Sequence, residues 1–373
     1  MNLTLQLQLL PTPEQKTVLF ATMERFNEAA TFAAKRAFEA GVFSQPSIHK
    51  LAYVEIRSQF GLSAQLAVRA IGKAVEAFAT LKTKGRKECP VFKPRGAVTY
   101  DQRNMGFKGV DKVSLATLEG RAILAMIYGE YQRQRFDRIK GQCDLVYRKG
   151  RFYLLCSVVI PDGSPVEPKD FIGVDLGIAN IATDSDGSTY SGKVVEQVRG
   201  RHHRNRKNLQ KRGTRGAKKR LKALAKREAN FRRHQNYVIS KTLVANAKGT
   251  ERGIALEDLK GIRDRTTVRA KQRSQHASWS FHQLRGMVEY KAKLAGVFVV
   301  TVDPRNTSRT CSACGHCEKA NRKSQSEFVC KHCGYSENAD FNAALNLRAR
   351  AWAVCKPASE LAALVSQPES RLL

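Results

Sequence analysis

Three acidic residues stand where their side chains could bind metal ions together. Asp175 and Glu257 each end a short apolar run that predicts a β-strand, and Asp340 follows directly on two Cys-x-x-Cys pairs. A strand end holds a carboxylate rigidly at the rim of a sheet, and three converging carboxylates form a site that divalent cations neutralise. Phosphodiester hydrolysis uses two such cations about 3.5 to 4 Å apart, bridged by shared carboxylates. We therefore expect these three acids to hold two Mg²⁺ ions and to be the catalytic residues.

Other polar residues near these acids have competing roles. A single acid at a strand end or in the first turn of a helix more often caps or faces solvent, so only the occurrence of three together favours catalysis. Asp184 and Asp258 are candidates for outer ligands, although the turn beside Asp184 favours a surface position. Asn338 and Asn342 flank Asp340, and either could orient it or contact phosphate. Helix capping is an equal alternative for Asn338.

Two Cys-x-x-Cys pairs, separated by 15 residues, predict a structural zinc site. The predicted ligands are Cys311, Cys314, Cys330 and Cys333. Each pair places two thiolates at one turn, and together the pairs complete the tetrahedral shell of one Zn²⁺ ion. Because a closed shell leaves no open position, this ion is expected to shape the domain and not to perform the chemistry. Cys317, His316 and His332 are alternative ligands that the spacing leaves open.

A strongly basic run extends from Arg199 to Arg233. It holds 16 Lys or Arg residues and one acid, Glu228. A charge run is by default a solvated helix face, but cations at this density repel one another, so a phosphate backbone lying alongside explains the run better. The residues predicted to contact nucleic acid are Arg201, Arg204, Arg206, Lys207, Lys211, Arg212, Lys218, Lys219 and Arg220. His202, His203 and His234 are expected to join them as phosphate contacts.

The composition favours a globular partner of a polyanion. The chain has 373 residues, 42% of them hydrophobic, which is enough for two or three domains with a substantial core. Its formal net charge is +32, so nucleic acid is the expected partner. No apolar run reaches the roughly 18 residues of a membrane-spanning helix, so no membrane partner is expected and the protein is expected to be soluble and cytoplasmic. Nine cysteines fit a reducing compartment with bound metal. Those outside the zinc element are expected to be buried or incidental thiols: Cys89, Cys143, Cys156 and Cys355.

The first 160 residues predict a β-rich domain interrupted by helices. Residues 3–9 alternate leucine with polar residues, as in a half-buried strand. Thr12, Pro13 and Gln15 form a capping box that starts a helix, and residues 47–60 and 63–82 predict two more. Short β-rich runs follow from 91 to 160. We therefore expect a small barrel or sheet that includes the first strand and carries the helices as an insertion.

A linker at residues 161–165 leads to a second domain. Strands are predicted at 172–176 and 181–183, with a turn at Asp186-Gly187, and again at the Glu257 run and at 297–302. The later half of the basic run is predicted to be helical. A polar loop at 263–273 precedes a helix whose apolar face begins at Phe281, with Trp279 and Phe281 as core aromatics, and another helix begins near Asn338.

These segments resemble the TnpB family of transposon-associated RNA-guided endonucleases, which are related to the type V CRISPR effectors. The family's three RuvC-like motifs resemble, in order, Gly173-Val174-Asp175-Leu176-Gly177, Leu256-Glu257-Asp258-Leu259 and Asn338-Ala339-Asp340-Phe341-Asn342-Ala343-Ala344. The lead-in to its zinc element resembles Val302-Asp303-Pro304 and Thr310-Cys311-Ser312-Ala313-Cys314-Gly315. The resemblance is specific from Gly173 to about Leu347. Before Asp162 it depends on the order of a strand, inserted helices and a β-rich stretch that contains Phe92-Lys93-Pro94-Arg95.

The resemblance implies a fold of class α/β plus β. An RNase H-like RuvC nuclease domain with a zinc-ribbon insertion would follow an N-terminal β-barrel, or wedge, domain with a helical recognition insert. The implied boundaries are 1–11 and 86–162 for the wedge domain, 12–85 for the recognition insert, 163–305 and 336–355 for the nuclease domain, and 306–335 for the zinc-binding target-nucleic-acid element. Residues 356–373 are expected to be a disordered tail.

The resemblance also implies an activity and partners. The chain would be an RNA-guided, Mg²⁺-dependent DNA endonuclease encoded by an insertion sequence in a prokaryote, and it would be nucleoid-associated. Its partners would be a guide RNA from the transposon end and double-stranded target DNA beside a short target-adjacent motif. One alternative is a nuclease-silent RNA-guided or zinc-ribbon regulator that occupies DNA without cutting it. Another is an unguided resolvase-like nuclease, which would cut junctions without RNA.

Overall fold

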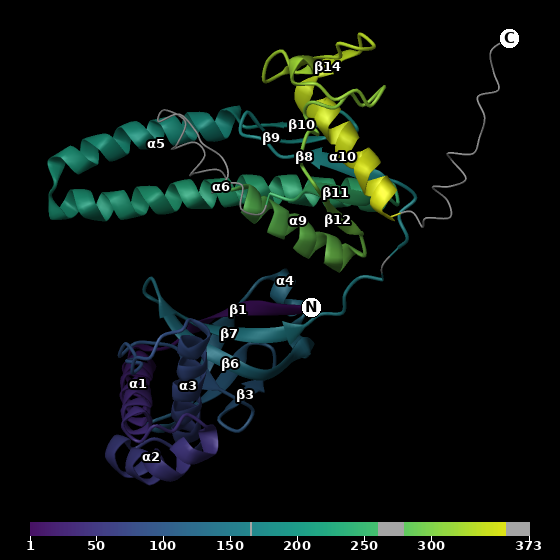
Figure 1. The fold of residues 1–373 in the computed structure, drawn as a ribbon. Helices are drawn as coiled ribbons and strands as arrows, with labels where there is room; N and C mark the ends of the chain where they lie inside the picture. The colour runs from purple at the N-terminus through teal and green to yellow at the C-terminus, as the bar shows by residue number, and fades with distance from the viewer. Residues whose placement is uncertain (165, 260–279, 356–373) are drawn as a thin grey trace. The chain divides into compact units, whose positions relative to one another are not determined.

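The computed structural model describes residues 1–164, 166–259 and 280–355, and the chain divides into two compact units, residues 1–161 and 162–373 (Figure 1). The division falls at the predicted linker. The predicted loop at 263–273, Trp279 and the tail after residue 355 lie outside the described residues. Of the described helices, none combines the length and the apolar character that a membrane crossing requires.

Unit 1 is built on a seven-stranded antiparallel sheet. Its strand order is β2-β6-β7-β1-β5-β4-β3. The strands are β1 (Asn2–Leu10), β2 (Val98–Tyr100), β3 (Met105–Lys108), β4 (Lys112–Thr117), β5 (Gly120–Ile127), β6 (Ile139–Arg148) and β7 (Arg151–Val159). The first strand pairs with β5 and β7, so it lies inside the sheet as predicted. The Tyr100 hydroxyl on β2 donates to the carbonyl of Ala116 on β4 (2.9 Å), which shows that the sheet curls until its two ends approach.

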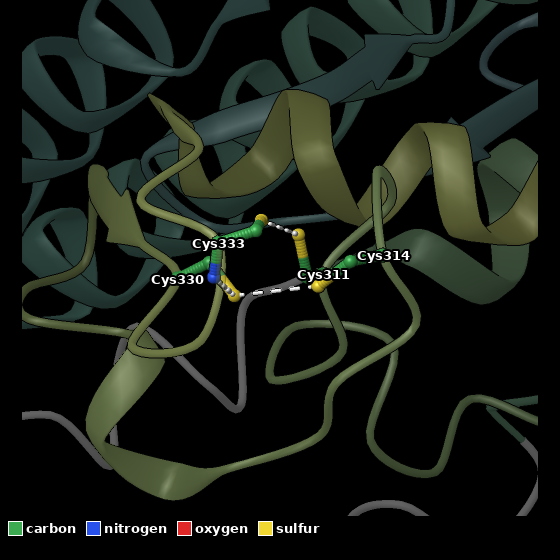
Figure 2. A group of neighbouring side chains, drawn as sticks. All are labelled: Cys311, Cys314, Cys330 and Cys333. Atoms are coloured by element: carbon green, nitrogen blue, oxygen red, sulfur yellow. Dashed lines mark hydrogen bonds between the residues drawn. The ribbon is translucent and has the colours of Figure 1, made fainter. Parts of the chain in front are cut away.

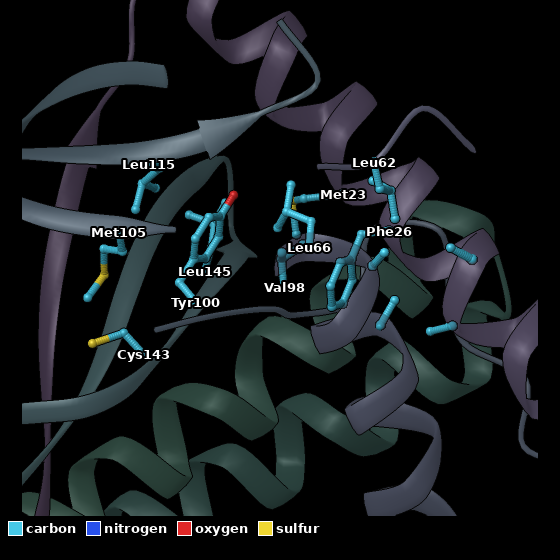
Figure 3. Packing of buried hydrophobic residues seen from close by; sticks show 14 of the residues in the cluster. Met23, Phe26, Leu62, Leu66, Val98, Tyr100, Met105, Leu115, Cys143 and Leu145 are labelled. Carbon is cyan, nitrogen blue, oxygen red and sulfur yellow. The ribbon is translucent and has the colours of Figure 1, made fainter. Parts of the chain in front are cut away.

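Three helices enter between β1 and β2, where the sequence predicts them. They are α1 (Pro13–Glu39), α2 (Gln45–Phe60) and α3 (Ala64–Thr83), and the short helices α4 (Glu130–Arg133) and η1 (Phe136–Arg138) lie between β5 and β6. The predicted capping box of α1 forms, with Thr12 and Gln15 each bonding the other's backbone N–H. Met23 and Phe26 of α1 meet Leu66 of α3 and Val98 of β2 in one hydrophobic core (Figure 3).

Unit 2 is built on a five-stranded mixed sheet of order β10-β9-β8-β11-β12. The strands are β8 (Phe171–Asp175), β9 (Asn180–Asp184), β10 (Thr189–Ser191), β11 (Gly253–Glu257) and β12 (Val299–Val302). β8, β11 and β12 are parallel, whereas β9 and β10 return antiparallel through the predicted turn. The four predicted strands of this sheet lie within a few residues of their predicted positions, and β10 follows the predicted turn. Because β8 and β11 are buried on both faces, their sequences are nearly continuous apolar runs.

Helices cover both faces of this sheet. One face, with Ile172 and Leu256, packs on α6 (Arg215–Gly249) and α9 (Phe281–Ala295), and Phe281 lies in this core as predicted. The other face, with Phe171 and Ala255, packs on α10 (Ala339–Cys355). The C-terminal helix crosses β8 at Gly173, where an added Cβ would lie 2.0 Å from the carbonyl oxygen of Ala344.

Both halves of the basic run are helical and form a hairpin, whereas only the later half was predicted to be helical. Helix α5 (Lys193–Arg212) occupies the half for which no helix was predicted, and α6 begins two residues after Gly213. Gly213 has a φ of 64°, a left-handed conformation that favours glycine at a helix end. Thr214 then caps α6 by accepting from the N–H of Ala217 (3.2 Å). The prediction missed α5 because its many cations give almost no apolar periodicity.

Candidate active site

Asp175 and Glu257 meet at one edge of the sheet of unit 2. Strands β8 and β11 run parallel with Val174 opposite Leu256, so the next residue of each strand emerges at the same edge. The two carboxyl groups share a hydrogen bond. Glu257 is 7% exposed, whereas Asp175 keeps partial contact with solvent. The parallel register thus brings together two acids that are 82 residues apart in sequence.

Asp340 reaches the same place from α10. Asn338 caps this helix, since its side-chain oxygen accepts from the backbone N–H groups of Asp340 (2.9 Å) and Phe341 (3.3 Å). Of the roles predicted for Asn338, the structure therefore shows helix capping. The Asp340 carboxylate accepts from Nδ2 of Asn180 on β9 (2.9 Å), and its charge acts on Asp175. The structure thus brings the three predicted acids together from β8, β11 and the first turn of α10.

The carboxyl groups of Asp175 and Glu257 resist ionisation where they stand. Burial, and then the charge of Asp340, raise the pKa of Asp175 to about 7. Burial, and then the neighbouring Asp175, raise the pKa of Glu257 well above its ordinary value. Such a cluster of oxygen donors with excess negative charge suits a divalent cation. The three carboxylates lie farther apart than the four cysteines do. In the described part of the chain, only the cysteines place three or more ligand atoms within 4.8 Å of one another.

Arg322 is a member of this site that the sequence analysis did not identify. Its Nη2 lies 3.6 Å from Oδ1 of Asp340, and its charge also lowers the pKa values of Asp175 and Glu257. The guanidinium is held by the carbonyls of Ser324 (3.2 Å) and Gln325 (2.9 Å). The sequence shows only one cation among several in the loop between the cysteine pairs, so no pattern could have singled it out.

Three residues predicted as possible helpers have structural roles instead. The prediction of a surface position for Asp184 is wrong, because this residue is 1% exposed. Its carboxylate accepts from the backbone N–H groups of Asp186 and Ser188 in the turn after β9. Asp258 accepts from Arg285 (3.0 Å). Asn342 accepts from the N–H of Ser312 (3.0 Å), so this side chain joins α10 to the cysteine element. Asp184 thus stabilises the turn, Asp258 pairs with α9, and Asn342 bonds to the cysteine element.

The four predicted zinc ligands form one cluster (Figure 2). Sγ of Cys311 lies 3.7 Å from that of Cys333, and Sγ of Cys314 lies 3.6 Å from that of Cys330. Backbone N–H groups, that of Cys333 first, lower the pKa of Cys330 to about 6, which favours the thiolate form that metals bind. Cysteine pairs with this spacing and mutual distance can hold one tetrahedral metal ion.

The alternative ligands lie outside this cluster. His316 is engaged with Glu318 (3.2 Å), and its ring stacks on that of His332 with the centroids 5.5 Å apart. Cys317 is exposed, and its backbone forms a bridge with Thr310. The geometry therefore selects the symmetric set among the ligand sets that the spacing leaves open.

The cysteine cluster is joined to the acidic site through α10. It organises η2 (Lys319–Asn321), β13 (Glu327–Val329) and β14 (Ser336–Asn338), and β14 leads directly into the helix that carries Asp340. Nδ2 of Asn346 donates to the carbonyls of Thr307 (2.8 Å) and Thr310 (2.7 Å) at the start of the element. A change in the cysteine element would therefore reach both Asp340 and Arg322.

Eight of the nine predicted nucleic-acid contacts are exposed on the α5–α6 hairpin. They are Arg201, Arg204, Lys207, Lys211, Arg212, Lys218, Lys219 and Arg220. Arg206 differs, because its Nη2 donates to Oε2 of Glu228 (2.8 Å), and His202 faces the same carboxylate (3.7 Å) instead of solvent. Glu228 is 6% exposed, so the single acid of the run fastens α5 to α6 and neutralises none of the eight cations.

Two family models match the chain between residues 155 and 347. Residues 155–260 match a model described as a probable transposase, OrfB_IS605. Residues 281–347 match the TNB domain of Cas12f1-like proteins. The first model spans the strands of Asp175 and Glu257, and the second spans the cysteine element and Asp340.

Curated relatives align over longer stretches of this chain than either family model. A CRISPR-associated endodeoxyribonuclease Cas12f1 of Sulfoacidibacillus thermotolerans is 32% identical over 247 residues, which are 61% of this chain and 56% of that protein. The putative RNA-guided DNA endonuclease InsQ of Escherichia coli is 28% identical over 72% of this chain and 70% of InsQ. A TnpB-like protein of Methanocaldococcus jannaschii is 28% identical over 65% of this chain and 91% of its own. The chain spans about half the length of the Cas12f1 relatives that it matches.

Solved structures share the fold. A Cas12f1–sgRNA–target DNA complex superposes with a TM-score of 0.63 at 14% identity, covering 93% of this chain and 98% of that one. A mini-RNA-guided endonuclease of the CRISPR-Cas phi type superposes with a TM-score of 0.54 at 10% identity, covering 96% and 93%. At these identities the likeness establishes architecture alone. The two family models and the curated relatives, one of which is named TnpB-like, confirm that this chain resembles the TnpB family.

Proposed function

We propose that the chain is an RNA-guided DNA endonuclease encoded by an insertion sequence, which cuts DNA beside a short target-adjacent motif. The observation that carries the proposal is the meeting of Asp175, Glu257 and Asp340 at one sheet edge. Relatives named as RNA-guided or CRISPR-associated DNA endonucleases support the reaction class. The eight exposed cations of the hairpin support a nucleic-acid partner. The proposed partners are a guide RNA from the transposon end and double-stranded target DNA.

The residues at the site suit two Mg²⁺ ions. All three acids offer hard oxygen ligands. The pKa values of Asp175 and Glu257 are raised because their negative charges are buried close together, and a bound cation would neutralise those charges. When bound, the two ions would activate the attacking water and stabilise charge on the scissile phosphate and leaving oxygen. Asp175 and Glu257, the last residues of β8 and β11, would hold metal. Asp340, oriented by Asn180, would complete the site.

Arg322 would act on the substrate side of this site. A guanidinium beside Asp340 is placed to attract a phosphate into the cluster of acids and to stabilise negative charge as it develops there. The cysteine cluster would hold one structural Zn²⁺ ion that fixes the loop of Arg322 and the start of α10. In this assignment zinc maintains the geometry and takes no part in the reaction.

The domain roles follow the same proposal. The sheet of unit 1, residues 1–11 and 86–162, would be the β-barrel wedge domain, and residues 12–85 its recognition insert. Residues 163–305 and 336–355 would form the RNase H-like RuvC nuclease domain, consistent with its strand order β10-β9-β8-β11-β12. Residues 306–335 would form the zinc-binding target-nucleic-acid element, a zinc ribbon.

The test is cleavage by the full chain purified with its co-expressed RNA. Wild-type protein should cut a guide-matched plasmid only with Mg²⁺ present, and Asp175→Ala should bind RNA equally but leave the plasmid intact. Asp258→Asn is the matched control, because this neighbouring acid pairs with Arg285 and should cut normally.

Two other outcomes would replace the proposal. Guided binding by the wild type without cutting would indicate a nuclease-silent regulator. Cutting of branched DNA by RNA-free protein would indicate an unguided resolvase-like nuclease. Equal cleavage by wild type and Asp175→Ala would remove the acids from the reaction altogether.

A further inference from the structure

The connection between α3 and β2 is irregular but firmly held. Residues 84–97 contain no helix or strand. Irregular connections of this length are uncommon within compact domains, and they are usually either functional or disordered. Polar side chains of α1 and α3, one of them buried and two partly buried, hold this connection in place, so disorder does not explain it.

Asn27 and Lys73 hold the end of this loop. Asn27 is fully buried, and its Nδ2 donates to the carbonyls of Pro94 (3.3 Å) and Gly96 (3.1 Å). Nζ of Lys73 donates to the carbonyl of Ala97 (2.6 Å) and to Oδ1 of Asn27 (2.6 Å). A Cβ on Gly96 would lie 2.7 Å from that same oxygen, so the backbone fits closely over the asparagine.

The middle of the loop is held in the same way. The hydroxyl of Thr31 accepts from the N–H of Phe92 (3.1 Å), and the ring of Phe92 lies 5.0 Å from the Lys73 ammonium. Burial lowers the pKa of Lys73 to about 8. Burying an ammonium and an amide is costly unless their hydrogen bonds are satisfied. These groups are satisfied largely by the loop backbone, which stabilises one conformation of it.

The outer side of the loop carries cations that lack acidic partners. Exposed lysines with no ion pair among the described residues are Lys82, Lys84, Lys87 and Lys93. Arg86 pairs with Glu88 (3.6 Å), and Arg95 pairs with Glu24 (3.1 Å). Lysines near a helix C-terminus are favoured by the helix dipole, which accounts for Lys82 and Lys84. It does not account for Lys87 and Lys93, or for the way in which Asn27, Thr31 and Lys73 hold the loop.

We propose that residues 82–97, which we call the α3–β2 loop, form a phosphate-backbone contact surface for nucleic acid in unit 1, additional to the hairpin of unit 2. Because the loop is held in one conformation, its unpaired lysines keep fixed positions, as contacts with the regularly spaced phosphates of a nucleic-acid backbone require. Phe92 is the one aromatic residue in this segment, and its ring lies against Lys73, so the loop offers no exposed ring on which bases could stack. The contact therefore positions the nucleic acid and does not read its sequence.

The test is a salt titration of binding by the full chain. Fluorescent 20-base-pair DNA and a hairpin RNA are titrated separately with Lys87→Gln/Lys93→Gln protein between 50 and 300 mM salt. If the loop contacts two phosphates, the slope of log Kd against log salt falls by about 1.4–1.8 for the nucleic acid that it binds. The arm that changes identifies DNA or RNA as the partner. The control variant is Lys16→Gln/Lys50→Gln, which removes two exposed cations from α1 and α2.

A second variant tests the rigidity of the loop without changing charge. Gly96→Ala should weaken binding several-fold in the same arm, because its methyl group displaces the backbone from Asn27. Thermal melting checks that Gly96→Ala is folded, and if it is not, the lysine pair alone decides. The proposal is overturned if the lysine pair leaves both slopes unchanged, or if the control lowers them equally. Wild-type protein that cuts guided DNA while the loop variant titrates like wild type would overturn this inference and leave the proposed function standing.

Discussion

Asp175 and Glu257 are in contact under conditions that disfavour their charges, which links the stability of the protein to pH and to metal. Because their folded pKa values are raised, the folded protein binds more protons than the unfolded chain from about pH 4, the ordinary value, up to the raised pKa values, of which that of Asp175 is about 7. The contribution of this pair to the free energy of unfolding therefore falls as the pH rises through that window, and levels off only above both raised pKa values. A cation would replace the lost protons.

We accordingly predict that Mg²⁺ raises the melting temperature at pH 8 and has little effect at pH 5. Each kcal/mol should correspond to a shift of about 2–4 °C for a unit of this size. Differential scanning fluorimetry with Mg²⁺ and with EDTA-treated protein measures it. Asp175→Asn should lose most of the pH-dependent part. Equal stabilisation at both pH values would show that Mg²⁺ binds elsewhere.

Arg322 is a cation held at the edge of the acidic site by backbone carbonyls. Arg322→Gln should slow DNA cleavage by roughly 100-fold, because a preorganised positive group near the reacting phosphate is lost. Single-turnover cleavage at saturating Mg²⁺ measures the effect, and zinc content should not change. Lys323→Gln is the matched control, since that neighbouring side chain pairs with Glu327 at the surface and should cut like wild type. Normal cutting by Arg322→Gln would assign the arginine a merely structural role.

The packing of α10 on β8 decides where Asp340 lies. The helix can approach the strand because Gly173 has no side chain: a Cβ there would also lie 2.6 Å from the backbone nitrogen of Arg348. Neither of the two backbones has a flexible group that could yield. A single methyl group should therefore separate the helix from the sheet.

We predict that Gly173→Ala destabilises unit 2 by roughly 1–3 kcal/mol or more and abolishes cleavage. Urea unfolding and the plasmid assay measure the two effects. Gly200→Ala in α5 is the control, because no atom lies within 4 Å of its added Cβ. It should be neutral or stabilise the helix by about 0.5–1 kcal/mol. Wild-type stability of Gly173→Ala would mean that the helix is not held this closely.

At the scale of the whole molecule, the net charge of +32 acts through a few surfaces. Replacing Arg204, Lys207, Lys211 and Lys219 by glutamine should lower the slope of log Kd against log salt by about 2.8–3.6, since each contacted phosphate contributes about 0.7–0.9. Fluorescence anisotropy with the co-purified RNA and with duplex DNA measures it. Swapping Arg and Lys at the same four positions keeps the charge and should preserve the slope. An unchanged slope in the glutamine variant would remove the hairpin from the interface.

Local sequence patterns predicted most of the helices and strands of the two units. In both, alternation, caps and apolar runs predicted the elements, because these are local properties of the chain. The longest element that the patterns missed is α5, whose cations conceal its periodicity. Its pairing with α6 depends on Glu228, a contact between residues of different helices that no local pattern reveals.

By itself, the sequence determined which residue types could do chemistry: three acids at predictable ends of elements and four cysteines at zinc spacing. Ligand chemistry and short-range spacing are written directly in the order of residues. Only the tertiary structure decided which of them meet. The parallel register of β8 and β11, the crossing of α10 at Gly173, and the reach of Arg322 are contacts between distant segments, and such contacts depend on packing that no local pattern encodes.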